Sequence, residues 1–247
     1  MQTTHENVRT TRNRMSEGQR RELATAISKV IPDDMPADIA QKWIGDGTSL
    51  KRVIYEALMP PVTTGDPLVD WKTLYKKCFG FDVDFTGLKI PEKKDGFERL
   101  IIVAKGVSPN RAYKACEKLF TCYRNTDDLN GATEGRNDRE ANQHYAIWVR
   151  DNAEADKQNS NVSASALKKR GGNYITLVER MLFEMKWFLE TGEHLDNDGT
   201  YTMCAGSRNS DGSVPYVYWY RSYGKLYVNW YDATDRDSRL RAREVVS

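Results

Sequence analysis

The sequence predicts an α+β domain over residues 68–247, preceded by a helical appendage over residues 1–62. Two observations support this fold class. Segments with apolar residues at helical spacing, which predict helices, are interleaved with short apolar or alternating runs, which predict strands. Between the two parts lies MPPVTTGDP, residues 59–67, whose three prolines and one glycine resist both a helix and a central strand. We place the boundary in this stretch.

The appendage begins with a polar segment, residues 1 to about 15, that predicts a disordered arm. Three short helices follow, and the first is expected to stop at Pro32. Thr48 or Ser49 is the expected N-cap of the third. Oligomerisation through these helices and tethering of the domain both stay open as roles. The three helices are predicted from three groups of apolar residues: Leu23, Ala26, Ile27 and Val30; Ile39, Trp43 and Ile44; and Leu50, Val53, Ile54, Ala57 and Leu58.

Helices and strands alternate in the first part of the domain. The best-defined helix is expected over residues 176–192, where a broad apolar stripe faces a core and Gly192 ends the helix. Ser108 and Pro109 suit the start of another helix over residues 108–120. Short helices are also expected at 70–80 and 163–170, strands within 97–106 and 144–151, and a long polar loop at 126–143.

From Tyr201 onward the chain has no helical period and predicts short strands and turns. Within it YVYWYRSYGKLYVNWY, residues 216–231, predicts a β-hairpin with its turn at Gly224. Because side chains alternate between the two faces of a strand, one face gathers the aliphatic residues and tryptophans that suit a core. These are Val217, Trp219, Leu226, Val228 and Trp230. The other face carries Tyr216, Tyr218, Tyr220, Tyr227, Asn229 and Tyr231, with Tyr223 at the tip.

The tyrosine-rich side of this hairpin predicts a ligand-binding surface. Tyrosine gives a large, stiff contact area with a polar tip, and Tyr with Ser, Asn and Arg is the composition of antibody-like binding loops. The alternative is that another layer of the domain covers the face, since tyrosine also favours strands. We expect exposure, because these positions lack Ile, Leu, Phe and Val. The candidate binding residues are Tyr216, Tyr218, Tyr220, Arg221, Tyr223, Tyr227, Asn229, Tyr231, Asp232, Arg236, Asp237 and Arg239.

Four segments carry a resemblance to a known family: HYAIWVRD, ITLVERMLFEMKWFLETGEHLD, CAGSRNSDGSVPYV and LRAREVVS. Over most of residues 97–247 the chain resembles bacterial variable proteins of diversity-generating retroelements, from uncultivated, small-genome bacteria, which have a C-type lectin fold. The resemblance implies two helices around a small twisted antiparallel sheet, with a variable surface at about residues 207–243. In such systems an error-prone reverse transcriptase substitutes adenines, and codons drift among Asn, Tyr, Asp, Ser and Arg. The outward residues of the hairpin fall within this set, and the inward ones would be the fixed scaffold.

The working hypothesis is a non-enzymatic binding protein, and its ligand is expected to be another protein, because a flat tyrosine surface suits a macromolecule better than a metabolite in a pocket. Sugar-binding C-type lectins hold calcium with paired acidic and amide residues, whereas here Tyr231 separates Trp230 from Asp232, so calcium-dependent sugar binding is not expected. The four cysteines form no CxxC pair and the three histidines stand far apart, which excludes a zinc-ribbon or disulfide-scaffold pattern. No catalytic residue, metal or cofactor is predicted.

Other candidate sites have simpler structural explanations. The segment LDNDGT, residues 195–200, lacks the ligand spacing of an EF-hand and predicts a turn. Cys204 has no second cysteine in this third of the chain and predicts a buried thiol. His144 and His194 lack the neighbours of a catalytic triad. The acidic residues Asp151, Glu154 and Asp156 predict a solvated loop.

Nucleic-acid binding is the alternative function. Aromatic rings with interleaved arginines can stack bases, and Arg208, Arg221, Arg236, Arg239, Arg241 and Arg243 lie in the same third as the tyrosines. Nearby acidic residues dilute this charge, and 37 Lys and Arg against 35 Asp and Glu leave no global field. Because no apolar run reaches membrane-span length and no signal peptide is recognised, a cytoplasmic location is the default expectation, with surface or virus-particle display left open.

Overall fold

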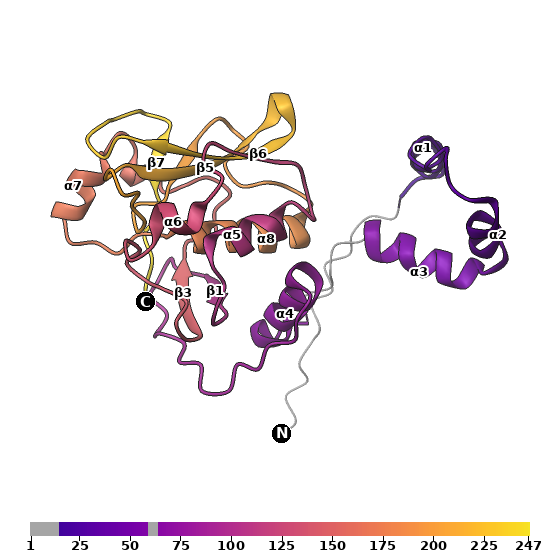
Figure 1. Ribbon diagram of the computed structural model, residues 1–247, viewed down its shortest axis with the longest axis horizontal. Coiled ribbons are helices and arrows are strands. Elements are labelled where there is room, and N and C mark those ends of the chain that lie inside the picture. The colour runs from indigo at the N-terminus through magenta and orange to yellow at the C-terminus, as the bar shows by residue number, and fades with distance from the viewer. Residues whose placement is uncertain (1–14, 59–63) are drawn as a thin grey trace, which may run out of the picture. The chain divides into compact units, whose positions relative to one another are not determined.

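The computed structural model describes residues 15–58 and 64–247 (Figure 1). The chain divides into two compact units, Met1–Met59 and Pro60–Ser247, and the division falls within the proline-rich stretch at residues 59–67. The predicted disordered arm lies almost wholly outside the described residues, as does part of that stretch. The described chain contains both helices and β-sheets, so the predicted α+β class is confirmed.

The N-terminal unit contains the three helices that the apolar spacing predicts, α1 (Glu17–Lys29), α2 (Ala37–Gly45) and α3 (Gly47–Leu58). Ser16 caps α1 through a reciprocal pair of hydrogen bonds with Gln19. The predicted cap of the third helix is wrong, because α3 begins at Gly47 and both Thr48 and Ser49 lie within its first turn. α1 and α2 bury none of their residues, so these helices gain little from apolar burial.

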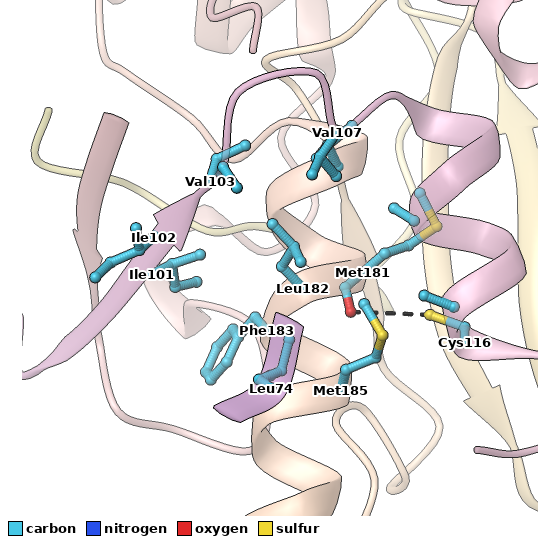
Figure 2. Packing of buried hydrophobic residues seen from close by; sticks show 14 of the residues in the cluster. Leu74, Ile101, Ile102, Val103, Val107, Cys116, Met181, Leu182, Phe183 and Met185 are labelled. Carbon is cyan, nitrogen blue, oxygen red and sulfur yellow. Dashed lines mark hydrogen bonds between the residues drawn. The ribbon is translucent and has the colours of Figure 1, made fainter. Parts of the chain in front are cut away.

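The core of the larger unit is built around α8 (Leu177–Thr191), the long helix that the apolar stripe predicts. Thr176 caps its start, and Gly192 ends it in the left-handed region at φ 76°. Three consecutive residues, Met181, Leu182 and Phe183, are completely buried, so neighbours surround the helix on nearly every side. Figure 2 shows these residues packed among side chains of β1 (Arg99–Val103) and α5 (Pro109–Cys116), the strand and helix expected in those segments.

Two hydrogen-bonding aromatic residues attach α4 (Pro67–Leu74) and the π-helical turn η1 (Tyr75–Phe79) to β1. The Trp71 indole donates to the Leu100 carbonyl at 3.2 Å. The buried Tyr75 hydroxyl donates to the Ile102 carbonyl and accepts from the Ala104 amide, both at 2.8 Å. β1 also pairs antiparallel with β3 (Tyr145–Val149), the second predicted strand, and completes a two-stranded ribbon.

A five-stranded sheet forms the opposite layer of the domain, with α5 and α8 between it and the β1–β3 ribbon (Figure 1). Its order is β2-β6-β5-β4-β7. The prediction of an antiparallel sheet is wrong for two of its four pairings, because β2 runs parallel to β6 and β4 runs parallel to β7. The strands are β2 (Cys122–Arg124), β4 (Tyr201–Met203), β5 (Val214–Tyr220), β6 (Lys225–Tyr231) and β7 (Leu240–Ala242).

The polar segment at residues 126–143 is not wholly a loop. It contains α6 (Leu129–Thr133), whose first amides are capped by the Asp128 carboxylate. An Asp at this position satisfies donors that the helix itself leaves free, and this makes a one-turn helix possible in an otherwise polar stretch. The short helix predicted at 163–170 is present as α7 (Ala164–Lys169), with Ser163 as its N-cap.

A buried ionic cluster ties α8 to the sheet and the C-terminal strand. Arg180 donates to Glu184 at 2.6 Å and to Asp196 at 2.8 Å, and all three side chains are completely buried. Arg243 also reaches Asp196, at 3.3 Å. The LDNDGT segment is therefore more than a turn, since Asp196 at its start is buried with φ 54°. Two cations and two carboxylates balance one another, which is the condition for burying charge.

The acidic residues after β3 are also part of the folded structure. Asp156 is 3% exposed and accepts hydrogen bonds from the Arg150 guanidinium at 2.6 Å and the Glu244 amide at 2.8 Å. Asp151 pairs with Arg99 at 2.8 Å. The prediction of a solvated acidic loop is therefore wrong for Asp156, because its carboxylate anchors the C-terminal strand segment.

Candidate ligand-binding surface

The predicted hairpin is formed by β5 and β6, which pair antiparallel over their full length. The chain reverses through a 3₁₀ turn at Arg221–Tyr223 and through Gly224, whose φ of 57° favours glycine. Cross-strand pairs Val217↔Val228 and Trp219↔Leu226 share the inward face, as alternation predicts. Val217, Leu226 and Val228 are completely buried, and the tryptophans pack half-buried against the same core, so the predicted inward set is confirmed.

Both hairpin tryptophans are held by groups from outside the hairpin. Trp219 stacks on His194 with ring centroids 3.3 Å apart and planes 5° from parallel. His194 contacts the buried Glu184 carboxylate through Nδ1 at 2.8 Å, which joins the hairpin to the ionic cluster on α8. The Trp230 indole donates to the Thr126 hydroxyl at 2.7 Å. These contacts make the inward side of the hairpin a rigid support.

The outward side carries a continuous layer of touching tyrosine rings, here called the tyrosine face. Neighbouring centroids range from 4.2 Å, between Tyr201 and Tyr218, to 5.9 Å, between Tyr218 and Tyr220. Pairs at such distances stabilise one another beyond their buried area. Each ring in the layer has a neighbour that also belongs to it. The tyrosine face consists of Tyr123, Tyr201, Tyr216, Tyr218, Tyr220, Tyr223, Tyr227 and Tyr231.

Two members of the tyrosine face, Tyr123 and Tyr201, are missed by sequence reasoning. Tyr123 lies on β2 with its ring 4.8 Å from Tyr227, and Tyr201 lies on β4 beside Tyr216 and Tyr218. Both strands are only three residues long, too short for alternation to be recognised. Their position beside the hairpin follows from strand order, which local pattern does not specify.

Exposure increases along the tyrosine face toward the hairpin tip. Tyr223 is 63% exposed, Tyr123 44% and Tyr220 37%, whereas Tyr216 and Tyr231 are half-buried. At that covered end Val214, on the same side of β5, is completely buried with Leu167 of α7 and Leu240 of β7. The expectation that all six outward residues are solvent-facing is therefore only partly met. A small second core covers one end. Tyr123, Tyr220 and Tyr223 toward the tip are exposed, and Tyr218 and Tyr227 between the two ends are half-buried.

Polar residues surround the tyrosine face and hold its loops. Arg239 donates to the Tyr201 hydroxyl at 3.0 Å, lies over that ring at 5.0 Å, and is ion-paired with Asp237 at 2.7 Å. The Asp232 carboxylate accepts from the Thr234 amide at 2.8 Å, which shapes the loop after β6. Asn229 accepts from the Trp230 amide at 2.8 Å. Arg221 and Arg236 are exposed.

Burial, reinforced by the neighbouring tyrosines, raises the pKa of Tyr216 and Tyr218 above the ordinary value near 10. Their hydroxyls therefore stay protonated at neutral pH and can donate as well as accept hydrogen bonds. The side-chain hydrogen bond from Arg239 lowers the pKa of Asp237, so that carboxylate stays ionised. The surface thus offers apolar ring area, neutral hydroxyls and a few fixed charges.

Of the arginines in the C-terminal third, Arg221 lies in the hairpin turn and Arg239 lies over the Tyr201 ring, while Arg208 and Arg243 are engaged elsewhere. Arg243 is 1% exposed and belongs to the buried ionic cluster, and Arg239 is neutralised by Asp237. Arg208 donates to backbone carbonyls of Ala205 and Ser207. This distribution lacks the basic stripe that follows a nucleic-acid backbone.

The four cysteines, with His144 and His194, are buried or hydrogen-bonded parts of the fold. Cys204 is completely buried, and burial raises the pKa of its thiol, so the expected buried thiol is confirmed. Burial likewise raises the pKa of Cys78 to about 11 and of Cys122 to about 12. His144 accepts from the Lys105 amide at 3.0 Å. Over residues 15–58 and 64–247, no group of three or more His, Cys, Asp and Glu is arranged to hold a metal ion.

Comparison of the chain with protein-family models, with curated proteins and with solved structures finds no match. Among the helices of the described residues, none is both long enough and apolar enough to cross a membrane.

Proposed function

We propose that this chain is a non-enzymatic binding protein whose tyrosine face, with the loops beside it, contacts a protein ligand. One observation carries the proposal: tyrosines from β2, β4, β5, β6 and the hairpin turn form one layer of touching rings that is open toward the tip. Three of these rings, Tyr123, Tyr220 and Tyr223, are exposed together, and grouped exposed aromatic side chains mark surfaces where soluble proteins contact a partner. Tyrosine is also enriched where proteins bind one another.

The form of the surface favours a macromolecule over a metabolite. Small ligands bind in concave pockets that enclose most of their surface, whereas the tyrosine face is one side of a sheet. Stiff rings lose little conformational entropy on binding, and their hydroxyls can form hydrogen bonds with many partners. These properties support a contact surface that tolerates changes in its residues.

We also propose that the domain is a C-type lectin-like scaffold that displays a diversified region. The presence of α5 and α8 beside a small five-stranded sheet supports this proposal, although two of the sheet's four pairings are parallel. The hairpin also supports a diversified scaffold, because its inward residues build the core and its outward residues form the tyrosine face. The inward residues are held by burial and by contacts to His194 and Thr126, whereas Tyr220 near the tip contacts other rings of the tyrosine face. Tyr216 and Tyr231 also pack against the second core, so a change at these two positions alters that core.

The DNA around the gene tests the proposed diversification. We expect a near-repeat of the codons for residues 207–243, beside a reverse transcriptase gene, that differs at adenines. The differing codons should be those of the outward hairpin residues and the flanking loops. The codons of Val217, Leu226 and Val228 should be identical in the two copies.

Tyr123 and Tyr201 provide an internal control for this test. They belong to the same tyrosine face and lie outside residues 207–243, so their codons should not vary between copies of the gene. A near-repeat whose differences fall equally on inward and outward codons would contradict the proposed scaffold. Absence of a repeat and of a reverse transcriptase would contradict diversification and leave a tyrosine-rich binding surface.

A further inference from the structure

A concave pocket of about 490 Å³ lies between the loop after α6, the C-terminal turn of α7 and the loop that leads into β5. Its wall carries three basic side chains, Arg136, Lys168 and Arg208, and one acidic side chain, Asp138. At neutral pH the side chains therefore carry a net positive charge. None of the three cations lies within 4.0 Å of a carboxylate in the described part of the chain.

Arg208 is the most constrained of the three cations. Its side chain is half-buried, and its Nη1 donates to the carbonyls of Ala205 and Ser207 at 2.5 and 2.8 Å. These two bonds fix the guanidinium and leave Nε and Nη2 without an acceptor among the described residues. A planar edge of two free donors is the arrangement that binds two oxygens of a carboxylate or phosphate.

Other donors and charges converge on the same space. Asn209 accepts from the Ser210 amide through Oδ1, so its Nδ2 is available as a neutral donor. Arg136 and Lys168 are exposed and reach the pocket from two other segments of the chain. Burial lowers the pKa of Arg208, while Asp138 opposes that effect, so an anion close to the guanidinium would relieve the cost of its burial.

We propose that this pocket binds an oxyanion, the phosphate or carboxylate group of a ligand. The Arg208 guanidinium would accommodate two oxygens, and Lys168 and Arg136 would supply further positive charge. The proposal stands independently of the tyrosine face, because it depends on a different set of side chains. It assigns to the chain a small-anion site in addition to its proposed protein-binding surface.

Isothermal titration calorimetry at low ionic strength, with inorganic phosphate in one arm and malonate in the other, tests this site. We expect saturable binding of one anion per chain in at least one arm, and the arm that binds identifies the group. The matched pair Lys168→Ala and Lys169→Ala removes one exposed lysine from the same turn of α7, but only Lys168 lines the pocket. Lys168→Ala should weaken binding about threefold to tenfold, and Lys169→Ala should leave it within about twofold.

A variant that strengthens binding separates the proposal from any loss of folding. Asp138→Asn removes the one carboxylate of the pocket wall and should tighten binding about twofold to fivefold. Arg208→Gln should weaken it by about tenfold or more. Absence of saturable binding in both arms would overturn the proposal. Equal effects of Lys168→Ala and Lys169→Ala, or weaker binding by Asp138→Asn, would overturn it as well.

Discussion

Asp196→Asn is expected to lower the free energy of unfolding by about 3–5 kcal/mol, because it leaves a buried cluster with two cations and one carboxylate. Asp196 accepts from Arg180 at 2.8 Å, from the Thr202 hydroxyl at 2.5 Å and from the Ala155 amide at 3.0 Å. The substitution keeps the shape and suits the left-handed backbone at φ 54°, since Asn tolerates that conformation. Because both carboxylate oxygens accept hydrogen bonds and the asparagine amide nitrogen cannot, the measured loss reports the missing charge together with a lost acceptor. Urea unfolding with an unchanged m-value measures it.

Asp198→Asn is the matched control for this prediction. Asp198 lies in the same turn, is exposed, and accepts from the Thr200 amide at 2.9 Å and the Thr200 hydroxyl at 2.6 Å. An amide oxygen can replace the carboxylate in both bonds, so the expected change stays within about 0.5 kcal/mol. Equal losses for the two variants would show that the buried charge at Asp196 does not stabilise the fold as described.

Leu226→Ala is expected to cost about 2–5 kcal/mol, whereas Tyr220→Ser should cost about 1 kcal/mol or less. Leu226 is completely buried beneath the hairpin, so its removal leaves a cavity in the main core. Tyr220 is 37% exposed, and it loses only contacts with other rings of the tyrosine face. Chemical denaturation of the two variants beside the parent chain measures the difference.

This contrast tests the separation of scaffold and surface within one hairpin. The two substitutions lie on neighbouring parts of β5 and β6 and differ mainly in the face of the sheet that they alter. If Tyr220→Ser costs as much as Leu226→Ala, the outward residues are part of the folding core. They could not then vary freely, and the proposed changeable surface would be wrong.

Local pattern predicts the hairpin because strand alternation acts over adjacent residues. Val217, Leu226 and Val228 face the core as the two-residue period requires, and Gly224 adopts the left-handed conformation of the turn. The helix over 177–191 follows in the same way from its apolar stripe and terminal glycine. In each case the information lies within about fifteen residues, the reach of a single element.

Features that depend on distant partners are not predictable in this way. Tyr123 and Tyr201 join the tyrosine face only because β2 and β4 become neighbours of the hairpin, one of them in parallel pairing. Asp196 appears in a sequence of ordinary turn residues, and Arg180 and Glu184 resemble the polar side of a helix. These three residues are buried together because Arg180 pairs with Glu184, 4 residues along the chain, and with Asp196, 16 residues along it. Arg243, near the C-terminus, supplies the second cation.

The central claim is that the tyrosine face binds proteins on a fixed scaffold, and binding by a diversified library tests it most directly. In one library Tyr216, Tyr218, Tyr220, Tyr227, Asn229 and Tyr231 vary among Tyr, Asn, Asp and Ser. In a control library the inward residues Val217, Trp219, Leu226, Val228 and Trp230 vary in the same way. Both are displayed and selected against a panel of purified proteins, and the affinities of selected clones are measured by titration.

We expect the outward library to remain folded and to contain clones that bind one panel member saturably and lose binding when the outward residues revert. We expect the inward library to lose folded protein before selection. The account would be contradicted if the outward library unfolds, or if it contains no saturable binder while its members remain folded.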